Sequence, residues 1–177
     1  MNAELGELKV VFTAEQIAAR VRELAHKISG DYHGRTVYAV CVLENGFIFM
    51  ADLVRELEVP VVCQFVKPEK REVEHGAEIF FSPEVNVKGK DVLLIEGIIQ
   101  SGVTQEFLVR NLTARGAVSV KLAALLDKQA GRRVSLQADY SGYTLGDSYV
   151  LGYGLGSPLL GRNLPYVACA AQATATG

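Results

Sequence analysis

Four short, continuous apolar runs constrain the fold of this chain more than any other feature of its sequence. They span residues 36–43, 60–66, 91–95 and 118–126 and are rich in Val, Ile and Leu. Runs of this length are typical of strands that are covered on both faces, as in a parallel sheet. Helical patterns separate several of them. The sequence therefore predicts an α/β fold with a mainly parallel sheet flanked by helices.

Helices are predicted over residues 14–29, 47–57 and 103–112. The first begins with Thr13 and Gln16, which are spaced as in a capping box, and Gly30 offers a C-cap. Gly116 is expected to end the third helix. Residues 67–78 carry many charges and little to bury, so we interpret them as a loop or lid, followed by a short strand at 78–81.

The length predicts a single domain over residues 1–177. With 177 residues, of which 49% are hydrophobic and 21% charged, the chain can bury a core of its own. We expect this core to span about 12–126. Beyond it the pattern changes to short strands, predicted at 134–140, 149–151 and 166–170, and glycine turns. These predict a small flap, or hood, over about 127–170, followed by a frayed tail at 171–177.

Charge and hydropathy exclude several classes of partner. A formal net charge of -2 gives no bulk electrostatic reason to bind nucleic acid or an anionic membrane, so an anionic ligand must be held locally. The sequence shows neither a secretory signal pattern nor an apolar run of about 18 residues. We therefore expect a cytoplasmic protein with no membrane partner. Cys41, Cys63 and Cys169 lie in apolar runs and are predicted to be buried, reduced thiols.

The turn at residues 96–104 is the strongest candidate for a binding site. It joins an apolar strand to a helix, whose unpaired N–H groups and dipole favour a phosphate group. Ser101 and Thr104 add hydroxyl donors, and Gly102 lets the backbone curl around a ligand. The plain alternative is an ordinary strand-to-helix turn, because parallel α/β domains contain several. The glycine and lysine spacing of a Walker loop is absent.

These residues resemble a known family. The run DVLLIEGIIQSGVT at 91–104 is similar to the phosphoribosyl-pyrophosphate signature of type I phosphoribosyltransferases. Residues 40–57, 125–128, 147–155 and 162–167 resemble, in order, further blocks of bacterial hypoxanthine-guanine phosphoribosyltransferases, so the resemblance covers about 12–170. It implies a type I phosphoribosyltransferase fold with a C-terminal hood. It also implies Mg²⁺-dependent transfer of ribosyl phosphate from phosphoribosyl pyrophosphate to a purine, and a homodimer or homotetramer.

The resemblance assigns roles to individual residues. The positions that would hold the 5-phosphate are Gln100, Ser101, Gly102, Val103 and Thr104. Those that would bind the purine are Lys128, Tyr149 and Val150. Those that would contact pyrophosphate are Glu44, Asn45 and Arg162, the first two in a turn whose unusual peptide exposes N–H groups. Each has a plain alternative: the lysine could be a solvated charge, the tyrosine a core residue, and the arginine a partner of a surface carboxylate.

The departures from the family all fall on the reaction chemistry. Gly97 replaces one of two adjacent acids and leaves Glu96 as the candidate catalytic and metal-binding carboxylate. Gln100 stands where the family has its general base, and an amide has no useful basicity near neutral pH. Gly156 replaces a metal-binding Asp, and Glu44 places an acid in the pyrophosphate turn. Residues 64–90 contain no Tyr for the family's lid.

The sequence therefore predicts a purine-nucleotide or phosphoribosyl-pyrophosphate binder whose transferase activity is weak or lost, with Mg²⁺ binding weakened or lost as well. Two alternatives stay open: an active hypoxanthine-guanine phosphoribosyltransferase of purine salvage, and a regulatory paralogue. If transferase activity is weak or lost, as predicted, Gly97→Asp and Gln100→Asp together are expected to raise the transfer rate.

Overall fold

The computed structural model describes residues 7–73, 76–82, 85–156 and 160–170. Its main sheet has six strands in the order β4-β3-β2-β5-β6-β7. Five of these run parallel and β4 is antiparallel to β3. The strands are β2 (Val37–Val42), β3 (Val61–Val73), β4 (Gly76–Ser82), β5 (Asp91–Ile99), β6 (Ser119–Lys128) and β7 (Tyr140–Leu145). The predicted α/β architecture with a mainly parallel sheet is confirmed.

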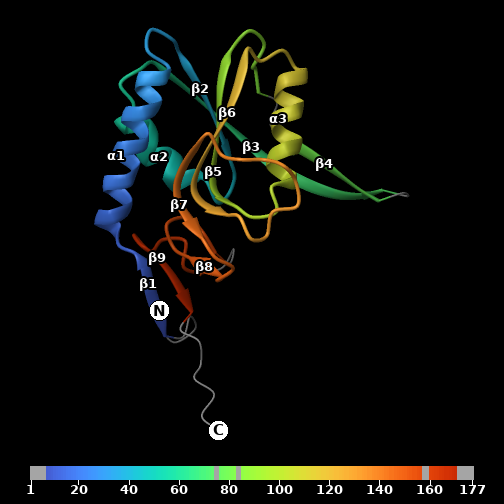
Figure 1. Ribbon diagram of the computed structural model, residues 1–177. Helices are drawn as coiled ribbons and strands as arrows, with labels where there is room; N and C mark the ends of the chain where they lie inside the picture. The colour runs from blue at the N-terminus through green and yellow to red at the C-terminus, as the bar shows by residue number, and fades with distance from the viewer. Residues whose placement is uncertain (1–6, 74–75, 83–84, 157–159, 171–177) are drawn as a thin grey trace.

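Helices cover both faces of this sheet, as Figure 1 shows. They are α1 (Ala14–Asp31), α2 (Phe47–Glu56) and α3 (Val103–Ala114). Leu93 and Ile95 of β5 belong to the core cluster that includes α1 and α2, whereas Val92 and Leu94 belong to the cluster that includes α3. Because side chains alternate along a strand, one continuous apolar run supplies both cores. None of the described helices is both long and apolar enough to cross a bilayer.

The first helix begins as predicted and ends later. Thr13 and Gln16 form the full capping box, with each side chain bonded to the other residue's backbone N–H. The helix runs through Gly30, and Tyr32 is its C-cap, so the predicted glycine cap is wrong. The helix continues past Gly30 because Ile28 and Tyr32, which are both buried, hold its last turn against the core.

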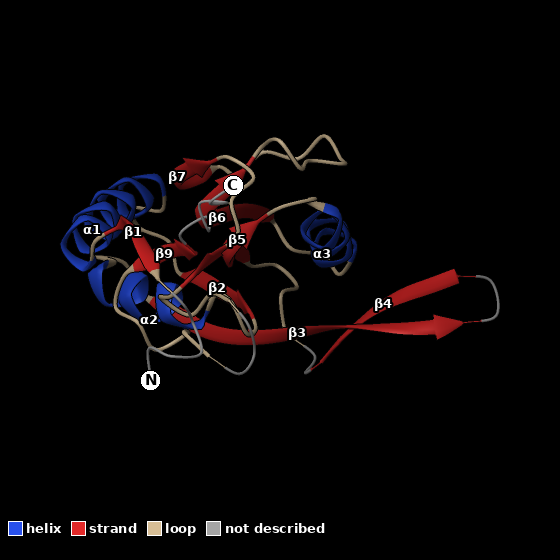
Figure 2. Cartoon of the chain, turned by 90° about the horizontal axis from the view of Figure 1, so that it is seen from below, coloured by secondary structure: helices blue, strands red, loops and turns tan. Residues whose placement is uncertain are grey.

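Residues 67–73 and 76–78 of the charged segment lie in two paired strands, so the prediction of a loop is wrong for these residues. β3 has 13 residues and pairs with β4 from Lys67 opposite Ser82 to Val73 opposite Gly76. Figure 2 shows this hairpin projecting away from the sheet. The two strands of such a ribbon pair through backbone hydrogen bonds, and neither of its faces has to be buried. The charged side chains of this segment therefore did not prevent it from forming a strand. The strand expected at 78–81 lies within β4.

The hood is built differently from the prediction. Its small antiparallel sheet has the order β1-β9-β8, with β1 (Leu8–Phe12), β8 (Val150–Leu151) and β9 (Val167–Ala170). Residues 134–139 form no strand. The strand instead spans Tyr140–Leu145 and joins the main sheet parallel to β6. Gly142 allows this approach, since a Cβ there would lie less than 3.0 Å from Leu125 O. The predicted tail at 171–177 lies outside the described residues.

The three cysteines occupy different environments. Cys41 is buried, Cys169 is partly buried and Cys63 is exposed, so the prediction of buried thiols fails for Cys63. All three are free. Burial raises the pKa of the Cys41 thiol to about 12. This thiol is therefore protonated and unreactive at neutral pH.

Candidate functional site

The predicted phosphate turn joins β5 to α3 at the carboxyl edge of the parallel strands. Gly102 is the N-cap of α3 and has φ 79°, in the left-handed region that glycine adopts without strain. Gly102 has no side chain to cap this helix end, and the Val103 nitrogen donates a long hydrogen bond of 3.5 Å to Ser101 Oγ. The first N–H groups of a helix lack intrahelical acceptors, and the dipole is positive there. The turn therefore offers donors to an anion.

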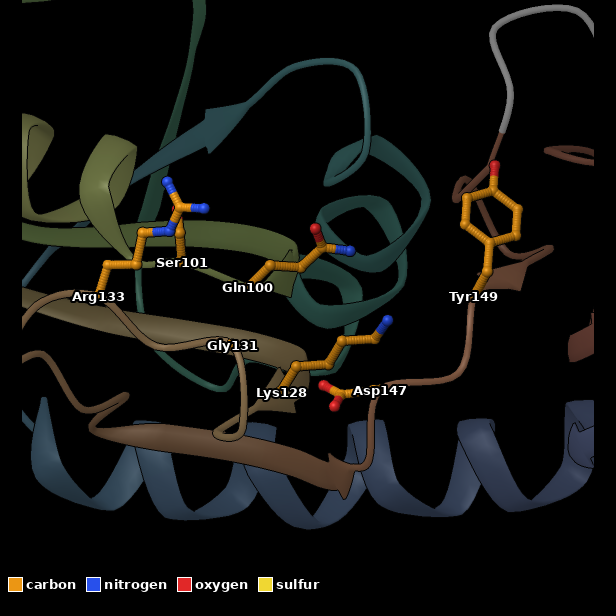
Figure 3. Close-up of a pocket in the computed structure, with 7 residues that line it drawn as sticks. All are labelled: Gln100, Ser101, Lys128, Gly131, Arg133, Asp147 and Tyr149. Atoms are coloured by element: carbon orange, nitrogen blue, oxygen red, sulfur yellow. The ribbon is translucent and has the colours of Figure 1, made fainter.

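A cavity of about 490 Å³ opens beside this turn. It is lined by Gln100, Ser101, Lys128, Gly131, Arg133, Asp147 and Tyr149. We call it the base cavity, because the resemblance implies that a purine base would bind there. Figure 3 shows Arg133 beside Ser101 at one end, the side chains of Gln100 and Lys128 extending into the middle, and Tyr149 at the far side.

For two of these residues the structure rules out the plain alternative, and their binding roles stay predictions. Lys128 is buried at 6% exposure, so it is not a solvated surface charge. Tyr149 is 59% exposed, so it is not a core residue, and its ring is free to stack on a planar ligand. Val150 is buried in β8 next to Tyr149 and is not among the residues that line the cavity.

An ion pair that the sequence did not reveal holds one wall of the base cavity. Asp127 and Arg132 form a buried pair, and Arg132 Nη1 also donates to the Leu136 oxygen at 2.9 Å. The Arg133 nitrogen donates to Ser101 O at 2.9 Å. These contacts fix residues 129–136 over the phosphate turn and place the Arg133 side chain in the cavity. The only sequence signal was two adjacent arginines after a glycine.

A second cavity, of about 310 Å³, lies on the other side of the turn. It is lined by Val42, Leu43, Asn45, Pro68, Glu96, Ile98, Gln100, Ser101, Thr104 and Gln105. We call it the acid cavity, because Glu96 is its one charged lining residue. Glu96 is 3% exposed and accepts hydrogen bonds from Gln105 Nε2 at 2.8 Å and from the Gly97 nitrogen at 3.2 Å. Burial outweighs these bonds and raises its pKa to about 7.

This raised pKa predicts a specific pH dependence of stability. Between the ordinary pKa of 4.5 and about 7, the folded state binds more protons at Glu96 than the unfolded state does. The free energy of unfolding therefore falls as pH rises through this window and stays low above it. We expect Glu96→Gln to remove that fall, since one pKa unit corresponds to about 1.4 kcal/mol.

Urea unfolding of the wild type and Glu96→Gln from pH 4.5 to 8 measures this effect. The stability of the variant relative to the wild type should increase by about 3 kcal/mol across the series. Carboxyl groups with lowered pKa values, such as Asp31, contribute equally to both proteins and cancel in the difference. Parallel stability curves for the two proteins would contradict the assignment.

Neighbouring atoms occupy the space beside Gly97 and Gly156, the two glycines that the resemblance places at acid positions. A Cβ at Gly97 would lie less than 3.0 Å from Asn45 O and 2.9 Å from Leu155 Cδ2. Gly156 has φ 113°, and a Cβ there would lie 2.8 Å from Leu151 Cβ. The turn after β2, whose Leu43–Glu44 peptide is cis, thus packs directly against β5. These glycines are required by the local packing.

The acid predicted to face pyrophosphate lies between two cations. Glu44 Oε1 is 3.2 Å from Lys67 Nζ, and Glu44 Oε2 is 3.3 Å from Arg162 Nη1. The hydrogen bond and charge of Lys67, together with the charge of Arg162, lower the pKa of Glu44. Arg162 therefore pairs with a carboxylate, which is the plain alternative for this residue, and no feature of the sequence indicated that Lys67 would join the pair.

The resemblance implies Mg²⁺, and the donor atoms here do not fit a site built from the protein alone. Mg²⁺ prefers six oxygen ligands, commonly including one or two carboxylates. Glu96 already accepts two hydrogen bonds, and Gly97 and Gly156 have no side chains to offer. Among the described residues, no group of three or more His, Cys, Asp or Glu side chains could hold a metal ion.

Comparison with known proteins agrees with this fold. The family model of the phosphoribosyl transferase domain matches residues 9–156. A hypoxanthine-guanine phosphoribosyltransferase from Bacillus subtilis is 35% identical over 163 residues, which cover 90% of this chain and 91% of that protein. The bifunctional protein TilS/HprT of Listeria innocua is 37% identical over 163 residues, and the match spans only 25% of its length.

Solved structures extend the likeness to three dimensions. A hypoxanthine-guanine phosphoribosyltransferase from Bacillus anthracis has a TM-score of 0.85 at 33% identity, covering 92% of this chain and 98% of its own. A Trypanosoma cruzi hypoxanthine phosphoribosyltransferase mutant complexed with the product IMP has a TM-score of 0.85 at 30% identity, covering 97% and 95%. The fold is thus that of the type I phosphoribosyltransferases. Within this class, the chain belongs to the hypoxanthine-guanine phosphoribosyltransferase family.

Proposed function

We propose that this protein binds a purine nucleotide such as IMP or GMP and transfers ribosyl phosphate weakly or not at all. One observation carries the proposal. The groups suited to holding a nucleotide surround the base cavity and its turn, whereas the positions that the resemblance assigns to the transfer reaction hold glycines, an amide and a buried carboxyl already bonded to Gln105 and to the Gly97 nitrogen. The binding half of the site is present and the reactive half is depleted.

The base cavity supports each part of a bound nucleotide. The phosphate accepts from the N–H groups at the start of α3 and from the hydroxyls of Ser101 and Thr104. Lys128 donates to the 6-oxo group of the purine, and the exposed Tyr149 ring stacks on the base. Val150 does not line this cavity, and the proposal that its backbone reads the edge of the base rests on the family resemblance. Arg133 adds positive charge near the phosphate.

The reactive positions do not support proton transfer. Gln100 lines both cavities, but its amide cannot take a proton from the purine near neutral pH. Glu96 is held by Gln105 and by the Gly97 nitrogen, so its oxygens are already engaged. A slow or absent transfer step follows.

The proposal includes a cytoplasmic homodimer or homotetramer, on the strength of the family resemblance.

Calorimetric titration of GMP and IMP tests the proposal. We expect the wild type to bind both, and Lys128→Gln to weaken binding about tenfold or more, because a buried charged donor is lost. Lys88→Gln, at an exposed position before β5 and so at the amino edge of the sheet, removes the same charge at the edge opposite the turn and should leave affinity unchanged. Absence of binding by the wild type would overturn the proposal.

A turnover assay separates the proposal from its main alternative, a working hypoxanthine-guanine phosphoribosyltransferase like the relatives named above. The assay combines hypoxanthine or guanine with phosphoribosyl pyrophosphate and Mg²⁺. Under the proposal the rate is low, and Gln100→Asp raises it by returning a basic group to the site. Efficient turnover by the wild type would favour the alternative.

A further inference from the structure

A carboxylate clamps two cations next to the acid cavity. Glu44 contacts Lys67 with one oxygen and Arg162 with the other, at 3.2 Å and 3.3 Å. The three residues come from separate parts of the chain. Asn45, which follows Glu44, and Pro68, which follows Lys67, line the acid cavity. Carboxylate and phosphate oxygens compete for the same ammonium and guanidinium donors. Glu44 thus occupies donors that would otherwise bind a polyanion.

The two cavities differ in their charge. Lys128 and Arg133 outnumber Asp147 in the lining of the base cavity. The acid cavity has Glu96 and no cation in its lining, and the cations beside it are paired with Glu44. An anionic group is therefore favoured on one side of the phosphate turn and opposed on the other.

We infer that Glu44 takes the place of a diphosphate group at Lys67 and Arg162 and so restricts this site to purine nucleoside monophosphates. The single phosphate of such a ligand binds at the start of α3, and the ligand leaves the Glu44 contacts intact. A ligand that also carries a diphosphate must displace Glu44 from both cations. The identity of the favoured ligand rests on the proposed function, whereas the competition at Lys67 and Arg162 does not.

The outcome of the competition between Glu44 and a diphosphate for these two cations depends on the ligand concentration. Glu44 and Lys67 are about half exposed, at 48% and 54%, and exposed ion pairs are weak because water screens them. Glu44 can therefore be displaced at high ligand concentration. It also adds a negative charge close to any diphosphate, and that repulsion disappears with the carboxylate. A neutral amide of the same shape removes both effects.

Titration of inorganic pyrophosphate in metal-free buffer tests this inference directly. We expect weak binding to the wild type and a gain of about tenfold or more in Glu44→Gln, with GMP affinity changed less than about twofold. Glu23→Gln serves as the matched control, since Glu23 is an exposed carboxylate paired with Arg20 on α1. It should leave pyrophosphate affinity unchanged. Adding both Lys67→Gln and Arg162→Gln to Glu44→Gln should remove the part of the gain that comes from the two released cations.

The outcomes separate the inference from the proposed function. Equal pyrophosphate affinity in the wild type and Glu44→Gln would overturn the inference even if GMP binds well. A gain that persists undiminished when Lys67→Gln and Arg162→Gln are both added would overturn it too, because the released cations would not be its source. Failure of GMP to bind any variant would overturn the proposed function while the pyrophosphate series still judges Glu44. An unchanged melting temperature in Glu44→Gln verifies that the variant is folded.

Discussion

Gly97→Asp is expected to destabilise the protein by about 4 kcal/mol or more and to restore no transferase activity. A Cβ at this position would lie less than 3.0 Å from Asn45 O, which is a backbone atom and cannot rotate away. The new carboxylate would also be buried beside Glu96, which burial already keeps from ionising readily. Overpacking and an unpaired buried charge are two of the changes that destabilise proteins most.

Two further variants separate these causes. Gly97→Ala adds the clash without the charge, so it should lose about 2 to 3 kcal/mol of the free energy of unfolding, measured in urea. Gln100→Asp adds a charge at an exposed residue and should lose less than about 1 kcal/mol. A folded Gly97→Asp protein with wild-type stability and faster transfer would contradict the packing described here, and would support the expectation drawn from sequence.

Asp127→Ala is expected to cost about 3 to 5 kcal/mol of the free energy of unfolding. Asp127 and Arg132 are buried, with side chains 6% and 13% exposed, and removal of one partner leaves the other charge without compensation. Because this pair also fixes residues 129–136 over the phosphate turn, GMP affinity should fall by about tenfold in the same variant. Urea unfolding and calorimetry measure the two effects.

The double variant Asp127→Leu with Arg132→Met is the control for this prediction. Replacing a buried ion pair by apolar side chains of similar size is often neutral, so most of the lost stability should return. The affinity for GMP should stay low, since Arg132 Nη1 no longer holds Leu136 O. If Asp127→Ala were as stable as the wild type, the ion pair would have no structural importance.

The fold was predictable where the determining interactions are local or periodic. Thr13 and Gln16 bond within one turn of helix, so their spacing in the sequence is enough to indicate the helix start. The apolar runs identified β2, β5 and β6 because strands buried on both faces must be apolar throughout. The hairpin of β3 and β4 was missed because its stability comes from cross-strand backbone pairing, which leaves no apolar pattern.

The site was predictable in its turn and not in its surroundings. Gly102 with its flanking hydroxyl residues lies in one continuous segment, so the resemblance located it directly. The contacts of Asp127 with Arg132 and of Glu44 with Lys67 and Arg162 depend on how loops meet after folding. Their residue types fit ordinary surface charges equally well. The roles assigned to Lys128 and Tyr149 stay predictions for the experiments above.

The order of strands in the hood has a consequence for synthesis on the ribosome. β9 lies between β1 and β8, so residues 167–170 are the only described partner of both Leu8–Phe12 and Val150–Leu151. β8, the strand that follows Tyr149, therefore lacks its described strand partner until residues 167–170 have emerged from the ribosome. The main sheet can assemble during translation, whereas the wall that carries the base-stacking ring is completed last. If the proposed nucleotide needs the wall that carries Tyr149, it can stabilise only molecules whose synthesis has passed β9.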